Sequence, residues 1–132
     1  MFLLRVIPLF AIVLITYNLI IFSTEGAGLQ TVLVTIPLVS EGNFDFDISS
    51  LLITLGIIFL YIEIIKATGT SVASIIEHVL SLLVFIAFLV EFIVVKQAST
   101  PTFFILTLMS LLDVIAGFTI SISSARRDVS MG

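Results

Sequence analysis

The chain has 132 residues, of which 60% are hydrophobic and 11% are charged, and its mean hydropathy is +1.37. These values lie far outside the range of soluble domains and indicate a protein whose main solvent is lipid. A net charge of -4 with only five Lys and Arg residues excludes a basic surface for nucleic acid. The absence of Cys excludes disulfides and thiolate metal sites.

Four apolar runs are long enough to cross a membrane as helices. They cover about residues 6–22, 48–65, 72–95 and 102–123, and a spanning helix needs about 20 apolar residues. Little chain is left for a separate soluble core. The sequence therefore predicts a single domain, an all-α integral membrane protein with four transmembrane helices in an antiparallel bundle.

Several residues mark where these helices begin. Asp47 is a candidate N-cap for the second span, and Thr100 is a candidate cap for the fourth, with Pro101 in its first helical position. Because the chain has no Trp, Tyr17 and Tyr61 are expected to lie at the membrane interfaces.

The positive charges predict the orientation. Arg5, Lys66, Arg126 and Arg127 fall on one side of a four-span bundle, and Lys96 alone falls on the other. Positive residues favour the cytoplasmic side, so both termini are expected there. A bacterial inner (plasma) membrane is the expected location.

The largest loop covers residues 23–47 and is acidic, with no Lys or Arg. Within it, residues 29–39 are apolar and β-branched but too short to span a membrane. This pattern predicts a re-entrant or interfacial segment that lies on lipid headgroups or against a neighbouring subunit. A loop folded over the helix ends is the alternative.

Ionisable residues gather near the turn between the second and third spans. Glu63 and Lys66 are three residues apart and can form an ion pair, and Glu77 and His78 lie near the same membrane face. They fit an interfacial cluster that tethers the two helices. They also fit a proton or cation site in which His78 titrates beside Glu77.

Asp113 falls near the middle of the fourth span, where a carboxylate is costly. It is expected either to hydrogen-bond to Ser110 and a neighbouring helix as packing glue, or to bind an ion. Glu91 is expected to pair with Lys96 near the outer interface, with an ion-binding role as the alternative.

Small and hydroxyl residues share one face of the fourth span, and Ser110, Gly117 and Ser121 are the candidates for helix packing. His78 is the single histidine and a candidate ligand of haem or pigment. No metal-ligand spacing and no catalytic motif is present, so neither a metal nor a cofactor is predicted and an enzyme is not expected.

The run Phe59-Leu60-Tyr61-Ile62-Glu63, followed by a short turn and two more spans, resembles the phosphate-starvation-inducible PsiE family of small bacterial inner-membrane proteins. The resemblance covers this motif, the four-span layout and the loop before the second span. It implies a multi-pass inner-membrane protein, and no functional residue is carried over.

The leading functional hypothesis is a non-enzymatic membrane protein that acts as a homo-oligomer or as an accessory subunit of a membrane complex. Its partners would be membrane lipids and other subunits, which contact the face from Ser110 to Ser121 and the acidic loop. The alternatives are a minimal ion- or proton-coupled transporter or channel that uses Asp113 and Glu91, and haem or pigment binding through His78.

Overall fold

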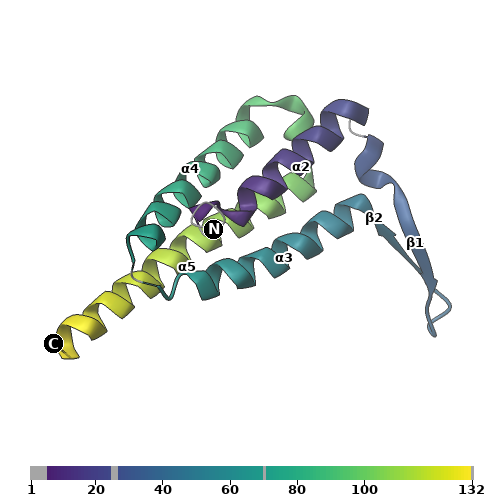
Figure 1. Ribbon diagram of the computed structural model, residues 1–132. Coiled ribbons are helices and arrows are strands. Elements are labelled where there is room, and N and C mark those ends of the chain that lie inside the picture. Colours follow the sequence, from purple (N-terminus) through teal and green to yellow (C-terminus); the bar gives the residue numbers. More distant parts are fainter. Residues whose placement is uncertain (1–5, 25–26, 70, 132) are drawn as a thin grey trace.

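The computed structural model describes residues 6–24, 27–69 and 71–131, and these residues form a mostly helical structure with one small sheet (Figure 1). The elements follow in the order α2 (Leu9–Thr24), η1 (Ala27–Gln30), β1 (Val32–Pro37), β2 (Asn43–Asp47), α3 (Ile48–Lys66), α4 (Val72–Val94), η2 (Lys96–Ala98) and α5 (Pro101–Met131).

Three of the helices are long and apolar enough to cross a membrane: α3, α4 and the part of α5 from Pro101 to Ser123. The predicted bounds of these spans agree with the structure to within one residue, except that α5 continues to Met131. The first predicted span differs more. Helix α2 has 16 residues and a rise of about 24 Å, which is short of a hydrocarbon core of about 30 Å.

The helices alternate in direction, as expected for an antiparallel bundle. Ser49 is hydrogen-bonded to Thr102 at one end of α3 and α5, and Ser121 is bonded to Ala67 at the other, so these two helices run parallel. Helices α2 and α4 run in the opposite direction (Figure 1). The N-terminal end of α2, the α3–α4 turn and the C-terminal part of α5 therefore lie at the same end of the bundle.

The predicted helix caps are confirmed. The amide of Ser50 donates to Oδ1 of Asp47 at 2.8 Å, and the amide of Phe103 donates to Oγ1 of Thr100 at 3.1 Å. Pro101 is the first residue of α5. Each side chain satisfies an amide that the first helical turn leaves without an intrahelical acceptor.

A two-stranded antiparallel hairpin occupies much of the acidic loop, so the all-α prediction is wrong in this segment. Strand β1 is part of the predicted re-entrant or interfacial segment, and it pairs with residues 43–47, for which no strand was expected. β-branched residues dominate β1 and Phe44 and Phe46 alternate with acidic residues in β2, which favours strands. Glu41 has a φ of 70° and helps to form the tight connection.

Four fully buried aromatic side chains pack against one another in the core of the bundle. We call Phe10, Tyr17, Phe88 and Phe103 the aromatic layer. Their ring centroids lie 4.8 Å apart for Tyr17–Phe103, 5.3 Å for Phe88–Phe103 and 6.5 Å for Phe10–Phe88, which is the usual range for aromatic packing. Tyr17 therefore packs inside the bundle, and its interfacial depth stays a prediction.

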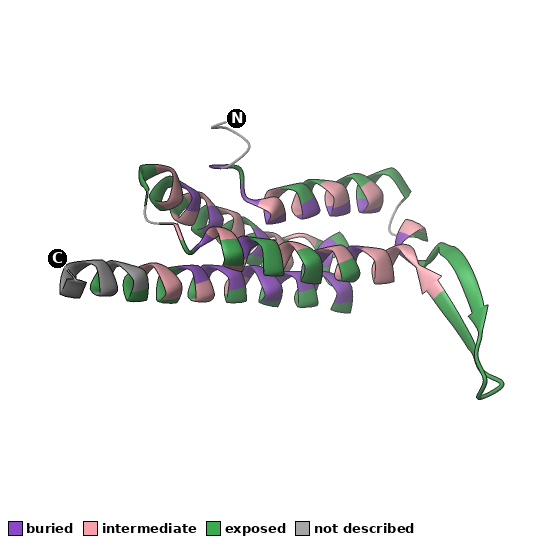
Figure 2. Ribbon diagram, turned by 60° about the horizontal axis from the view of Figure 1, so that its bottom comes forward, coloured by how far each residue is buried: buried purple, intermediate pink, exposed green. Residues whose placement is uncertain are grey.

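Figure 2 shows exposed residues along the outer sides of the helices. Many of these residues are large and hydrophobic, among them Ile15, Ile57, Leu83 and Ile115. Three threonine hydroxyls on this surface are satisfied within their own helices. Thr16 is partly exposed and Thr54 and Thr119 are exposed, and each donates to the carbonyl four residues earlier at 2.8 Å. Such a surface suits lipid, which offers no hydrogen-bond partner.

Candidate functional site

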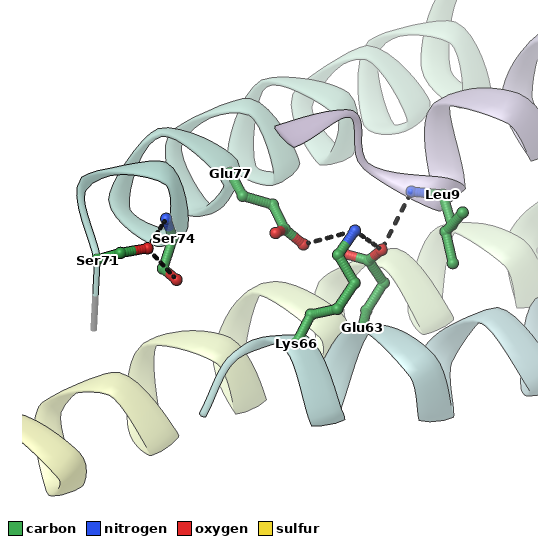
Figure 3. Close-up of polar contacts among 6 residues, drawn as sticks. All are labelled: Leu9, Glu63, Lys66, Ser71, Ser74 and Glu77. Atoms are coloured by element: carbon green, nitrogen blue, oxygen red, sulfur yellow. Dashed lines mark hydrogen bonds and ion pairs between the residues drawn. The ribbon is translucent and has the colours of Figure 1, made fainter. Parts of the chain in front are cut away.

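Lys66 lies at the centre of a group of carboxyl groups near the α3–α4 turn. Its Nζ is 3.2 Å from Oε1 of Glu63 and 3.2 Å from Oε1 of Glu77, so one ammonium serves two carboxyl groups (Figure 3). Glu63 and Glu77 are both buried, whereas the side chain of Lys66 is 24% exposed. The predicted ion pair between Glu63 and Lys66 is confirmed.

Glu63 has a second positive neighbour in the first turn of α2. The amide of Leu9 donates to Oε1 of Glu63 at 3.2 Å, as Figure 3 shows. This amide follows Pro8 and has no intrahelical acceptor, because it belongs to the first turn. The positive end of the helix dipole therefore faces the carboxyl group of Glu63.

Asp113 is the third buried carboxyl group in this region, with 5% of its surface exposed. It lies on the inward face of α5, within electrostatic range of Glu63 and Lys66. We call Glu63, Lys66, Glu77 and Asp113 the Lys66 cluster. The cluster brings together residues from α3, α4 and α5.

The hydrogen bond expected between Asp113 and Ser110 is not formed. Ser110 is 1% exposed, and its Oγ has no hydrogen-bond partner among the described residues. A buried hydroxyl without a partner costs about 1–3 kcal/mol. Ser110 therefore adds a polar group to the interior, one turn from Asp113, without neutralising it.

His78 packs against the small face of α5 and lies within electrostatic range of Glu63. Its Nε2 lies 2.5 Å from Oγ of Ser121, and Ser121 Oγ donates to the carbonyl of Ala67 at 3.3 Å. Because a hydroxyl has a single proton, this arrangement makes Nε2 of His78 the donor. A Cβ on Gly117 would lie 3.3 Å from the imidazole ring, so the glycine makes room for His78.

The face of α5 that carries Ser110, Gly117 and Ser121 is thus turned toward α3 and α4 of the same chain. From the sequence, this face was expected to contact other subunits. In the structure it is covered within the chain, because small residues allow His78 and Ala67 to approach the α5 backbone closely.

Glu91 lies at the other end of the bundle from the Lys66 cluster. Its Oε2 accepts a hydrogen bond from Nδ2 of Asn18 at 3.1 Å. The predicted ion pair between Glu91 and Lys96 is not formed. Among the side chains that the structure describes, two ion pairs are present, and Lys66 takes part in both. Lys96 is exposed in η2, beyond the end of the helix that carries Glu91.

Sequence reasoning missed the part played by Asn18 and Tyr17. The hydroxyl of Tyr17 is 2.6 Å from Oγ1 of Thr100, which ties α2 to the start of α5. The sequence does contain one indication of the Asn18 contact. Asn18 carries a side-chain amide inside a largely apolar helix, and a polar side chain at such a position usually has a hydrogen-bond partner.

Two polar regions are therefore separated by the aromatic layer. The Lys66 cluster lies toward the α3–α4 turn, and Asn18 with Glu91 lies toward the hairpin end. In the described part of the chain, no group of three or more His, Asp or Glu residues is arranged to hold a metal ion. The Lys66 cluster itself consists of three carboxyl groups and one ammonium.

No protein-family model, curated protein or solved structure matches the chain. The resemblance to the PsiE family remains a prediction from its sequence motif.

Proposed function

We propose that this chain is a small, non-enzymatic, multi-pass membrane protein that binds protons inside the bilayer at the Lys66 cluster. The observation that carries this proposal is the sharing of one ammonium by two buried carboxyl groups, with Asp113 close by. With every group ionised, three carboxylates and one ammonium leave two negative charges. Buried charge of that size requires compensation, and protons supply it.

The proposed membrane arrangement places four helices across a bacterial inner membrane with both termini in the cytoplasm. Lys66 and Arg126 belong to the end of the bundle that carries the termini, and Lys96 and the acidic hairpin belong to the opposite end. This distribution supports the orientation. Maleimide that cannot cross membranes should label Val39→Cys from outside intact cells and should not label Arg126→Cys.

Proton movement across the bundle would connect the Lys66 cluster with Glu91. Phe88 lies eleven residues after Glu77 in α4, about 16 Å along the helix, and Glu91 follows one turn later. A proton that crosses the membrane through the chain therefore passes the aromatic layer. Asp113 lies on one side of this layer, and Glu91 lies on the other.

The test is proton uptake by liposomes that contain the purified chain, followed with an internal pH dye. We expect uptake driven by a pH gradient, and we expect Asp113→Asn to abolish most of it. Glu41→Gln, which neutralises an exposed carboxyl group at the tip of the hairpin, is the matched control and should leave uptake unchanged. Equal uptake by the wild type and Asp113→Asn would rule out transport through this residue.

A second proposal is assembly, as a homo-oligomer or as an accessory subunit. It is favoured by an open apolar groove of about 370 Å³ where α4 and α5 meet, lined by Phe92, Ser99, Thr100, Pro101 and Phe104. A side chain of a neighbouring membrane helix fits such a groove. Native mass spectrometry of the particle extracted from its own membrane should then show more than one chain, and a monomer without other proteins would contradict assembly.

A further inference from the structure

The two faces of the hairpin differ in chemistry. Val34 pairs with Phe46 and Ile36 pairs with Phe44, so these four side chains project from one side, which we call the apolar face. Thr35 pairs with Asp45 on the other side, where its hydroxyl donates to Oδ1 of Asp45 at 2.8 Å. The hairpin is therefore amphipathic across its thickness.

The apolar face is largely uncovered by the rest of the chain. Val34, Ile36 and Phe44 are 48%, 46% and 45% exposed, and Val39 at the tip is fully exposed. The rings of Phe44 and Phe46 lie 6.2 Å apart, so the aromatic groups form a continuous patch. A two-stranded hairpin is marginally stable by itself in water, and burial of this face would stabilise it.

The hairpin is held in a defined direction relative to the helices. The amide of Ile48, the first residue of α3, donates to the carbonyl of Thr31 at 3.0 Å, and Asp47 both ends β2 and caps α3. Figures 1 and 2 both show the hairpin leaving the bundle at this end and extending across the direction of the helices. Because spanning helices run close to the membrane normal, a segment that crosses their direction extends along the membrane surface.

We propose that the hairpin lies on the lipid bilayer, with its apolar face in the outer edge of the hydrocarbon and its acidic face in water. Asp45 on the opposite face remains hydrated. The hairpin shares no residue with the Lys66 cluster, so its position on lipid does not depend on the proton site.

A second copy of the chain is a weaker candidate for the occupant of this face. A stable protein interface takes about 800 Å² from each partner and about 20–30 residues a side. The apolar face has four side chains on two strands of six and five residues. Contact with lipid needs no such minimum area. The bundle already anchors the chain in the bilayer, so the hairpin does not have to supply the binding energy by itself.

The test uses the absence of Trp from the chain, which makes any introduced Trp the sole indole fluorophore. The variant Phe44→Trp is reconstituted in phosphatidylcholine vesicles whose acyl chains carry bromine, a quencher within the hydrocarbon. We expect loss of most of the Trp fluorescence relative to vesicles without bromine, a blue-shifted emission, and little quenching by aqueous acrylamide. Thr35→Trp on the acidic face is the matched control, and we expect acrylamide to quench it and brominated lipid to leave it bright.

Ile36→Trp repeats the measurement from the neighbouring strand, so one poorly folded variant does not decide the result. The proposal would be overturned if acrylamide quenched Phe44→Trp and Ile36→Trp as strongly as it quenches Thr35→Trp. The hairpin would then be free in water. Protection of both from acrylamide and from brominated lipid would also overturn it, because a protein surface would then cover the face. Disulfide cross-linking of Val34→Cys would show whether that surface is a second copy.

Discussion

Nζ of Lys66 on α3 lies 3.2 Å from Oε1 of Glu77 on α4, and this ion pair joins the two helices across their turn. The same ammonium lies 3.2 Å from Oε1 of Glu63. Removal of the lysine therefore affects two carboxyl groups, whereas removal of either carboxyl group leaves one ion pair intact.

We expect Lys66→Met to destabilise the protein by about 2 kcal/mol. Loss of one partner of a fully buried pair costs about 3–5 kcal/mol, and the partial exposure of Lys66 reduces this cost. Glu77→Gln should cost less, and the double variant should recover part of the loss. Thermal unfolding followed by circular dichroism in detergent provides the measurement. Lys96→Met, which removes an exposed lysine, is the control. If the Tm of Lys96→Met were as low as the Tm of Lys66→Met, the prediction would be contradicted.

The contact between Tyr17 and Thr100 should contribute measurably to stability. We expect Tyr17→Phe to cost about 1 kcal/mol, the usual net value of one hydrogen bond. Thr100→Val should cost about twice as much, because Thr100 also caps α5 through the amide of Phe103. Tyr61→Phe is a matched control at an exposed tyrosine. Equal Tm values for the wild type and Tyr17→Phe would contradict this role.

Gly117→Ala should displace the imidazole of His78. The added Cβ would lie 3.3 Å from the ring, closer than ordinary van der Waals contact, so the imidazole must shift by a few tenths of an ångström to accommodate it. Because the chain has a single histidine, the ¹⁵N shifts of its imidazole report the contact directly. We expect Gly117→Ala and Ser121→Ala to move the Nε2 signal in the same direction. Ala87→Val, on an exposed position of α4, should leave it unchanged.

The start of α3 should depend on pH through Asp47. Hydrogen bonds from the amide and the hydroxyl of Ser50 lower the pKa of Asp47 below its ordinary value of 3.8. Because the folded-state pKa is the lower one, the contribution to stability is present above pH 3.8 and is lost as pH falls through the folded-state pKa. Amide exchange of Ser50 should accelerate in this acidic range relative to its intrinsic rate. Asp47→Asn should remove this acceleration. If the amide exchange of Ser50 still accelerated at acidic pH in Asp47→Asn, the titrating group would not be Asp47.

The sequence was sufficient to predict the parts of the fold that depend on local chemistry. The α3 and α4 spans follow from uninterrupted apolar runs, and the caps at Asp47 and Thr100 follow from side chains that accept hydrogen bonds ahead of a helix. The pair of Glu63 and Lys66 follows from their spacing on one helix. Each of these predictions uses residues that are close in sequence.

Features that depend on distant residues were not predictable. The partner of Glu91 is Asn18 on α2, and nothing in the local sequence of α4 indicates it. The amide of Leu9 reaches Glu63 because the first turn of α2 lies beside the end of α3. The hairpin was missed because β1 pairs with a strand of alternating aromatic and acidic residues, whose apolar side becomes visible only once the register is known.

The aromatic layer also has an electrical consequence. Phe10, Phe88 and Phe103 are closely packed and fully buried, so they exclude water and the mobile charge that water carries. In the proposed membrane arrangement, a charge that moves between the Lys66 cluster and Glu91 crosses this layer. A voltage of 100 mV is worth about 2.3 kcal/mol for each elementary charge that crosses the whole membrane. We therefore expect the membrane voltage, as well as the pH difference, to drive or oppose that movement.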